Sequence, residues 1–162
     1  EGQDELISTG EMVGKLKAAV AARRDPSTVI AGRTAALKVE DTARTVERVK
    51  AYAACGVDCI FVIGVESVDQ VKAIHDAARL PVIVGSAPAS IKREDFAKAG
   101  ARVLLQGHQP VAAAVKALRA VYEHLHNGGA AADLKDRIAS NKEMDALVFG
   151  EDYKKYMRDF MR

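Results

Sequence analysis

The sequence predicts an α/β fold built around a parallel sheet. Short apolar runs rich in β-branched residues alternate with longer segments in which apolar residues recur at helical spacing. This alternation is typical of strand-then-helix units. The strands are predicted at 28–31, 59–64, 81–84 and 102–105, where the sequence reads TVIA, CIFVIG, PVIV and RVLL. Because each run is continuously apolar, we expect buried strands of the kind that helices cover.

Amphipathic helices are predicted before and between these strands. Met12, Leu16 and Val20 mark the apolar stripe of the first helix, which ends at the Asp-Pro pair 25–26. Further helices are predicted at 42–54, 68–78, 93–99 and 110–125. Residues 1–129 are therefore expected to form four strand-then-helix units preceded by a helix.

The segment 130–162 has a different pattern, because it is helix-prone and contains no predicted strand. Its apolar residues are too many for a solvated tail, so we expect them to pack on another surface. Two surfaces remain open at this point, a second copy of the protein or the chain's own first domain. The apolar residues are Leu134, Ile138, Met144, Leu147, Phe149, Tyr153, Tyr156, Met157 and Phe160.

Composition excludes several classes of protein. The 162 residues are 49% apolar and 28% charged, which excludes a disordered chain, and the net charge of +2 argues against a nucleic-acid or membrane-surface binder. No apolar run approaches the roughly 18 residues of a membrane helix, so we expect a cytoplasmic location. Cys55 and Cys59 have no clustered Cys or His partners and are interpreted as buried apolar residues.

Polar residues at the predicted strand ends are the candidate site residues, because ligands of parallel α/β folds bind beyond the carboxyl ends of the strands. Arg33 follows the first strand, and its guanidinium suits a carboxylate or a phosphate, although a structural ion pair is the alternative. Ser86 follows the third strand as a polar lining or turn residue. His108 follows the fourth and could donate a hydrogen bond or transfer a proton. Glu66 is expected to belong to a helix start.

Four stretches of the chain resemble the isocitrate lyase/phosphoenolpyruvate mutase superfamily. They read ELISTGEMVGKLKAAVAARRDPSTVIAGRT, AYAACGVDCIFVIGVES, LPVIVG and AGARVLLQGHQPVAAAVKAL. The lyase branches carry a glutamate late in the second of these strands, where this chain has Ile63, and an Asn-Met-Thr motif where it has Gly85-Ser86-Ala87. The GVES and GHQ segments resemble the oxaloacetate decarboxylase branch instead. Decarboxylases of that branch tend to have a tyrosine near Ala87.

The resemblance implies that the chain is the C-terminal half of a (β/α)8 TIM barrel with an additional helical C-terminal tail. In this superfamily the eighth helix is exchanged between subunits, so the resemblance implies a homo-oligomer, a dimer of dimers, in which the tail 130–162 helps to dimerise. The Mg²⁺ ligands of the superfamily come from the first four strands, and none is assigned to this chain. We therefore expect the N-terminal half of the same barrel as a partner, joined through a loop that would end near Glu1.

The implied activity is Mg²⁺-dependent decarboxylation of oxaloacetate to pyruvate and CO₂ through an enolate. Arg33 and His108 are then the catalytic residues, and both bind substrate together with Ser86. The alternatives are phosphonopyruvate or phosphoenolpyruvate P–C bond chemistry and another C–C lyase reaction on the same scaffold. A non-catalytic half barrel that acts as an assembly partner is the alternative of another class.

Overall fold

The computed structural model describes residues 5–161. The chain divides into two compact units, Glu1–Gly107 and His108–Arg162. Glu1 lies outside the described residues, so the expected loop end there is not observed. Within the described part of the chain, no helix combines the length and the apolar character needed to cross a membrane.

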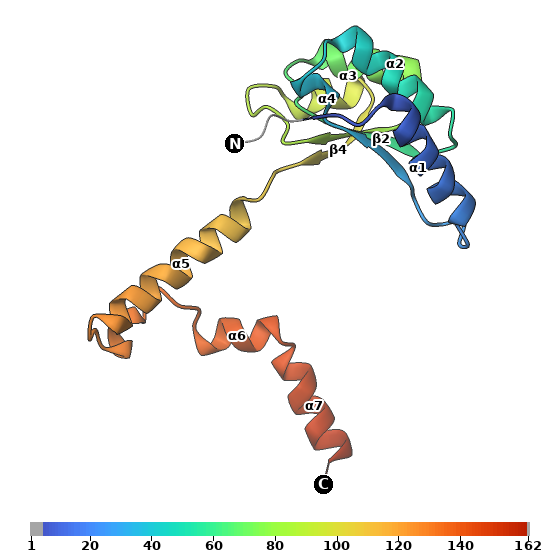
Figure 1. Ribbon diagram of the computed structural model, residues 1–162. Coiled ribbons are helices and arrows are strands. Elements are labelled where there is room, and N and C mark those ends of the chain that lie inside the picture. The colour runs from blue at the N-terminus through green and yellow to red at the C-terminus, as the bar shows by residue number, and fades with distance from the viewer. Residues whose placement is uncertain (1–4, 162) are drawn as a thin grey trace. The chain divides into compact units, whose positions relative to one another are not determined.

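The first unit contains a four-stranded parallel sheet (Figure 1). Its strands are β1 (Ala31–Thr34), β2 (Cys59–Ile63), β3 (Val82–Gly85) and β4 (Ala101–Leu105), and they lie in the order β1-β2-β3-β4. Each neighbouring pair is parallel. The predicted α/β fold with a parallel sheet is confirmed.

Helices alternate with the strands and cover one face of the sheet (Figure 1). They are α1 (Thr9–Ala22), the short 3₁₀ helix η1 (Ala36–Lys38), α2 (Thr42–Ala53), α3 (Val68–Ala78) and α4 (Arg93–Lys98). Asp41 caps α2 by accepting a hydrogen bond from the Arg44 amide at 2.8 Å. A capping box of Ser67 and Gln70 starts α3, as the sequence around Glu66 predicted.

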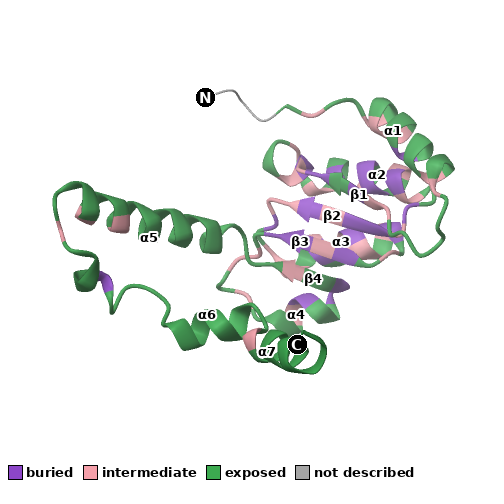
Figure 2. Cartoon of the chain, turned by 90° about the horizontal axis from the view of Figure 1, so that it is seen from below, coloured by how far each residue is buried: buried purple, intermediate pink, exposed green. Residues whose placement is uncertain are grey.

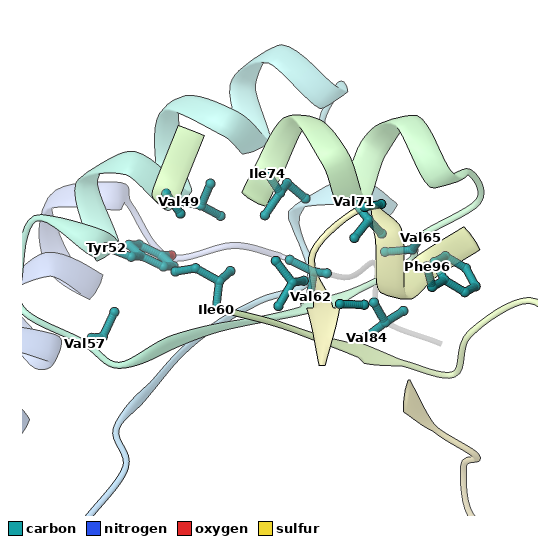
Figure 3. Packing of buried hydrophobic residues seen from close by; sticks show 14 of the residues in the cluster. Val49, Tyr52, Val57, Ile60, Val62, Val65, Val71, Ile74, Val84 and Phe96 are labelled. Carbon is teal, nitrogen blue, oxygen red and sulfur yellow. The ribbon is translucent and has the colours of Figure 1, made fainter. Parts of the chain in front are cut away.

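The hydrophobic core lies between the sheet and these helices (Figure 3). Ile60 and Val62 of β2 point into it from below, and Val49, Tyr52 and Ile74 enter from α2 and α3. All five are at most 2% exposed. This face of the sheet is therefore complete within the first unit.

The predicted first strand is wrong by three residues, since β1 begins at Ala31 and not at Thr28. In the sequence, the apolar run ends at Ala31, directly before Gly32. The structure keeps Gly32 inside β1, where a Cβ would lie 3.3 Å from the Tyr52 side chain. A side chain at this position would be tightly packed against Tyr52, so a glycine suits it. Arg33 consequently lies within β1, paired with Phe61, and does not follow the strand.

The opposite face of the sheet is open (Figure 2). No helix in the described part of the first unit covers it, and Val103 and Leu105 are 43% and 42% exposed. One row of paired residues crosses this face from β1 to β4: Arg33, Phe61, Ile83 and Val103. The expectation that helices bury these strands therefore holds for one face only. The other carries apolar side chains and has no covering layer among the described residues of the first unit.

Helices are the regular elements among the described residues of the second unit. This unit contains α5 (Gln109–His126), η2 (Ala131–Leu134), α6 (Asn141–Leu147) and α7 (Gly150–Phe160). Among its described residues only Leu134 is buried. An exposed apolar stripe runs along α5 at helical spacing: Val111, Val115, Leu118, Tyr122 and Leu125. The role of the tail 130–162 in dimerisation stays a prediction.

Candidate functional site

Arg33 lies on the open face of the sheet, near the carboxyl end of β1. Its guanidinium carbon is 5.6 Å from the centre of the Phe61 ring, which belongs to the neighbouring strand. A cation is attracted to the face of an aromatic ring, so Phe61 stabilises this position of the Arg33 guanidinium. No residue in the stretch 5–161 forms an ion pair with Arg33, and its side chain is exposed. The predicted alternative, a structural ion pair, has no partner among these residues, which leaves the guanidinium available for an anion.

A cavity of about 330 Å³ lies beside Arg33. Its lining includes the segment 5–7 that precedes α1, residues 33–35 at the end of β1, and Ile63 at the end of β2. Arg48 and Tyr52 line it from α2. The cavity therefore sits at the carboxyl edge of the sheet, where ligands of parallel α/β proteins bind.

Ser86 follows β3 at the same edge of the sheet. Its φ of 54° lies in the left-handed region, which is uncommon for a residue other than glycine. The side chain is exposed. Strands two positions apart in a sheet are about 10 Å from each other, so Arg33 and Ser86 share an edge without touching. Ser86 does not line the cavity beside Arg33, and the joint role of the two residues in binding stays a prediction.

His108 is the N-cap residue of α5 and the first residue of the second unit. Its carbonyl accepts hydrogen bonds from the amides of Val111 and Ala112, while its exposed imidazole forms no hydrogen bond with any described residue. Gly107 before it has a φ of 84°, which a residue with a side chain rarely adopts. Arg33 and His108 belong to different units, so their predicted meeting in one pocket stays a prediction.

The sequence analysis missed Arg48, which is 7% exposed and lies on the buried stripe of α2. It forms an ion pair with Glu40 at 3.2 Å and donates to the Tyr52 hydroxyl at 3.3 Å. Burial disfavours its charge, but hydrogen bonds to Tyr52 and Glu40 and the electrostatic interaction with both residues more than compensate and raise the pKa of the guanidinium above its ordinary value. The available signal was its spacing, since Thr45, Arg48, Val49 and Tyr52 follow the i, i+3, i+4, i+7 pattern of a core-facing stripe.

The acidic, histidine and cysteine side chains of residues 5–161 do not gather into a metal site, because no three of them lie close enough together to hold an ion. Cys59 is buried, and that burial raises the pKa of its thiol, which makes it unreactive. The described charged residues that line the cavity beside Arg33 are three cations, Arg33, Lys38 and Arg48, and one acidic residue, Glu5.

Comparison with protein families matches residues 1–126 to the family described as phosphoenolpyruvate phosphomutase. The chain belongs to this family. Among curated relatives, an oxaloacetate decarboxylase of Rhodopseudomonas palustris (strain HaA2) is 42% identical over 149 residues, which are 91% of this chain and 51% of the relative. An oxaloacetate decarboxylase of Bradyrhizobium diazoefficiens is 37% identical over 155 residues, covering 90% of this chain and 54% of the relative. The resemblance predicted from the sequence is confirmed.

A solved structure of phosphonopyruvate hydrolase in complex with oxalate and Mg²⁺ superposes with a TM-score of 0.78 at 25% identity. The match covers 100% of this chain and 59% of that structure. The chain thus spans about half the length of the curated relatives that it matches.

Proposed function

We propose that this chain is the C-terminal half of a (β/α)8 barrel enzyme that decarboxylates oxaloacetate to pyruvate and CO₂. The observation that carries the proposal is Arg33, whose guanidinium has no ion-pair partner within residues 5–161 and lies on an open apolar sheet face beside a cavity at the carboxyl edge. The decarboxylase relatives, at about 40% identity, support the choice of substrate.

The unfinished sheet supports the half-barrel architecture. β1 and β4 are its two edges, and each has one neighbouring strand within the described residues. Exposed edges of a parallel sheet invite aggregation, whereas closing a barrel pairs both edges and encloses the inner face. Four further strands would turn the row from Arg33 to Val103 into an interior wall. The partner is then the N-terminal half of the same barrel.

Decarboxylation breaks the bond between the β-carbon of oxaloacetate and its carboxylate. The bonding electrons move into the carbonyl, which becomes an enolate, and CO₂ leaves before a proton returns to the carbon. Arg33 would hold a substrate carboxylate through paired hydrogen bonds and stabilise the enolate charge. His108 would orient the substrate or supply the proton, and Ser86 would line the pocket.

Magnesium is the cofactor that the resemblance implies, but the residues described here do not form a site that fits it. Hard cations such as Mg²⁺ need several oxygen ligands, whereas Glu5 is the one acidic residue among the described residues that line the cavity, beside three cationic residues. We therefore propose that the Mg²⁺ ligands lie on the N-terminal half, and no step is assigned to the metal on this half.

The exposed stripe of α5 supports exchange of this helix between subunits. Val111, Leu118 and Tyr122 on that stripe are 66%, 57% and 69% exposed, which is unusual for one face of an 18-residue helix. A dimer in which α5 packs on the partner's barrel would bury this stripe, and the tail 130–162 would add to the interface. The proposed assembly is a dimer of dimers.

Carbon–phosphorus bond chemistry on phosphonopyruvate is the second candidate. The superposition on phosphonopyruvate hydrolase favours it, since Arg33 could hold the carboxylate of phosphonopyruvate equally well. Assaying the whole protein with both substrates in the presence of Mg²⁺ separates the candidates. A protein that turns over neither substrate would support a non-catalytic assembly role.

The substitution Arg33→Ala in the whole protein tests the proposed role of Arg33. Losing one positioned donor should lower kcat/KM for oxaloacetate by about 10²-fold or more. The melting temperature should change little, because Arg33 forms no ion pair within residues 5–161 whose loss would leave a partner charge unpaired. Arg102→Ala is the matched control. Arg102 is also an exposed arginine of this sheet, but its Nη1 atom donates to the carbonyls of Ala97 and Ala101, both at 3.1 Å. Near-normal turnover by Arg33→Ala would remove Arg33 from the mechanism.

A further inference from the structure

Arg48 is an arginine in a position that ordinarily takes an apolar residue. It faces the core from α2, between Thr45 and Tyr52, and only 7% of it is exposed. Burying a guanidinium is unfavourable unless its charge is paired and its donors are satisfied. Its partners therefore indicate what the burial achieves.

The charge of Arg48 is paired locally by Glu40. The Nε and Nη2 atoms donate to the two carboxylate oxygens of Glu40 at 3.4 and 3.2 Å. Glu40 precedes α2 by two residues, so this pair joins the helix to the loop directly before it. This ion pair uses the Nε and Nη2 atoms of Arg48 and leaves the Nη1 atom to bind elsewhere.

The Nη1 atom, however, reaches a distant part of the chain. It donates to the backbone carbonyl of Ile7 at 3.1 Å, across 41 positions of sequence. Ile7 belongs to the segment 5–7, which has no regular secondary structure and precedes the N-cap residue of α1, Ser8. A charged donor to a carbonyl is among the stronger hydrogen bonds in proteins. Arg48 therefore fixes the path of this segment.

The segment that Arg48 holds lines the cavity beside Arg33. Residues 5–7 line it, as do Arg33, Arg48 and Tyr52. The hydroxyl of Tyr52 accepts from Nη1 of Arg48, so Tyr52 helps to aim this donor. The buried Arg48 thus connects the wall of the cavity to the core. The exposed Arg33 lines the same cavity and can contact a ligand there.

We propose that Arg48 is a positioning residue for the Arg33 site. It holds the segment 5–7 as a wall of the cavity, so that a substrate carboxylate meets Arg33 in one orientation. The inference rests on the proposed function, because the substrate is the one proposed above. Misplacing a binding group by about 1 Å can cost up to about 10²-fold in rate, so a loosened wall should have a measurable effect.

Arg48→Lys tests the proposal in the whole protein, since lysine keeps the charge but its single ammonium cannot reach both Glu40 and Ile7 in the same geometry. We expect KM for oxaloacetate to rise about tenfold, with kcat changed less than about threefold. Cleavage after Glu5 in the native protein by a glutamate-specific protease should become about tenfold faster, because the segment is released.

Arg23→Lys is the matched control at the other end of α1. Arg23 is the C-cap residue of that helix and pairs with Asp58 at 2.8 and 3.3 Å, so the same substitution weakens a comparable ion pair away from the cavity. It should lower the melting temperature without changing KM or the cleavage after Glu5. Glu40→Gln, which keeps the bond to Ile7, should behave like this control.

Two outcomes overturn the proposal. One is that Arg48→Lys lowers the melting temperature but leaves KM and the Glu5 cleavage rate at the values of Arg23→Lys. The other is that Glu40→Gln raises KM as much as Arg48→Lys does, which would make the ion pair the cause. A wild-type protein without oxaloacetate turnover contradicts the proposed function instead. The cleavage rates after Glu5 then still show whether Arg48 restrains the segment 5–7.

Discussion

The two faces of the sheet differ in how far this chain completes them. On the covered face, Ile60, Val62 and Val84 are 0% exposed, and the arginine on that side, Arg48, is paired within the chain. On the open face, Val103 and Leu105 are more than 40% exposed, and Arg33 has no ion pair with a described residue. Both faces have the apolar side chains of a protein interior. The covered face is therefore a closed core within the first unit, whereas the proposed role of the open face depends on strands from the other half of the barrel.

Matched isoleucine substitutions on the two faces give the largest expected effect. Ile60 points to the covered face of β2, and Ile83 lies on the open face of the adjacent β3. Ile60→Ala should lower the free energy of unfolding by about 2–5 kcal/mol, since it leaves a cavity in a closed core. If the open face is a barrel interior in the whole protein, Ile83→Ala should have a similar effect there. Urea unfolding with a constant m-value is the measurement.

A much smaller loss of unfolding free energy in Ile83→Ala than in Ile60→Ala would contradict the half-barrel proposal. Surface substitutions typically change stability by less than about 0.5 kcal/mol. An Ile83→Ala variant of the whole protein within that range would mean that the open face stays in contact with solvent.

Acid should lower the stability of the protein in part through Asp58, which lies directly before β2, and Arg33 on the open face should not contribute to this effect. A hydrogen bond from the Ile30 amide, with help from the Arg23 guanidinium, holds the pKa of Asp58 below its ordinary value of 3.8. A lowered pKa means that the folded state favours the carboxylate, so its contribution is present above pH 3.8 and is lost as the pH falls through the lowered pKa.

The melting temperature measured from pH 5 to pH 2 tests this expectation. Asp58→Asn should flatten part of the decline in that range, while Arg33→Ala on the open face should leave the decline unchanged. A wild-type decline that Asp58→Asn reproduces in full would show that Asp58 does not contribute to it.

Periodicity was enough to predict the sheet and its helices. The apolar runs around Ile60, Val82 and Val103 identify three of the strands to within one residue, and the amphipathic segments between them identify the helices. The first strand was misplaced because an apolar run cannot show that Gly32 is kept small by a tyrosine 20 positions later. The sequence also could not predict that helices cover only one face of the sheet. A continuous apolar run places apolar residues on both faces alike.

The candidate site could be predicted only in part. Arg33 was identified because it stands beside a buried strand, although its partner Phe61 depends on register, which single-sequence patterns do not give. Arg48 was missed because a charge on a helix is ordinarily assigned to solvent. Its bond to Ile7 joins two segments that the sequence does not relate to each other. Contacts of this kind depend on tertiary packing and leave no local signal.

The central claim is that the open sheet face is an inner barrel wall in the whole protein, and thiol labelling of a Val103→Cys variant tests it most directly. Val103 is 43% exposed in this chain, so its cysteine replacement would react freely with a maleimide if nothing covered it. In the native whole protein we predict labelling at least about 100-fold slower than in the urea-unfolded variant. Peptide mass spectrometry can use the buried Cys59 as an internal reference. Labelling of the introduced thiol within about threefold of the unfolded rate, with Cys59 still protected, would contradict the account.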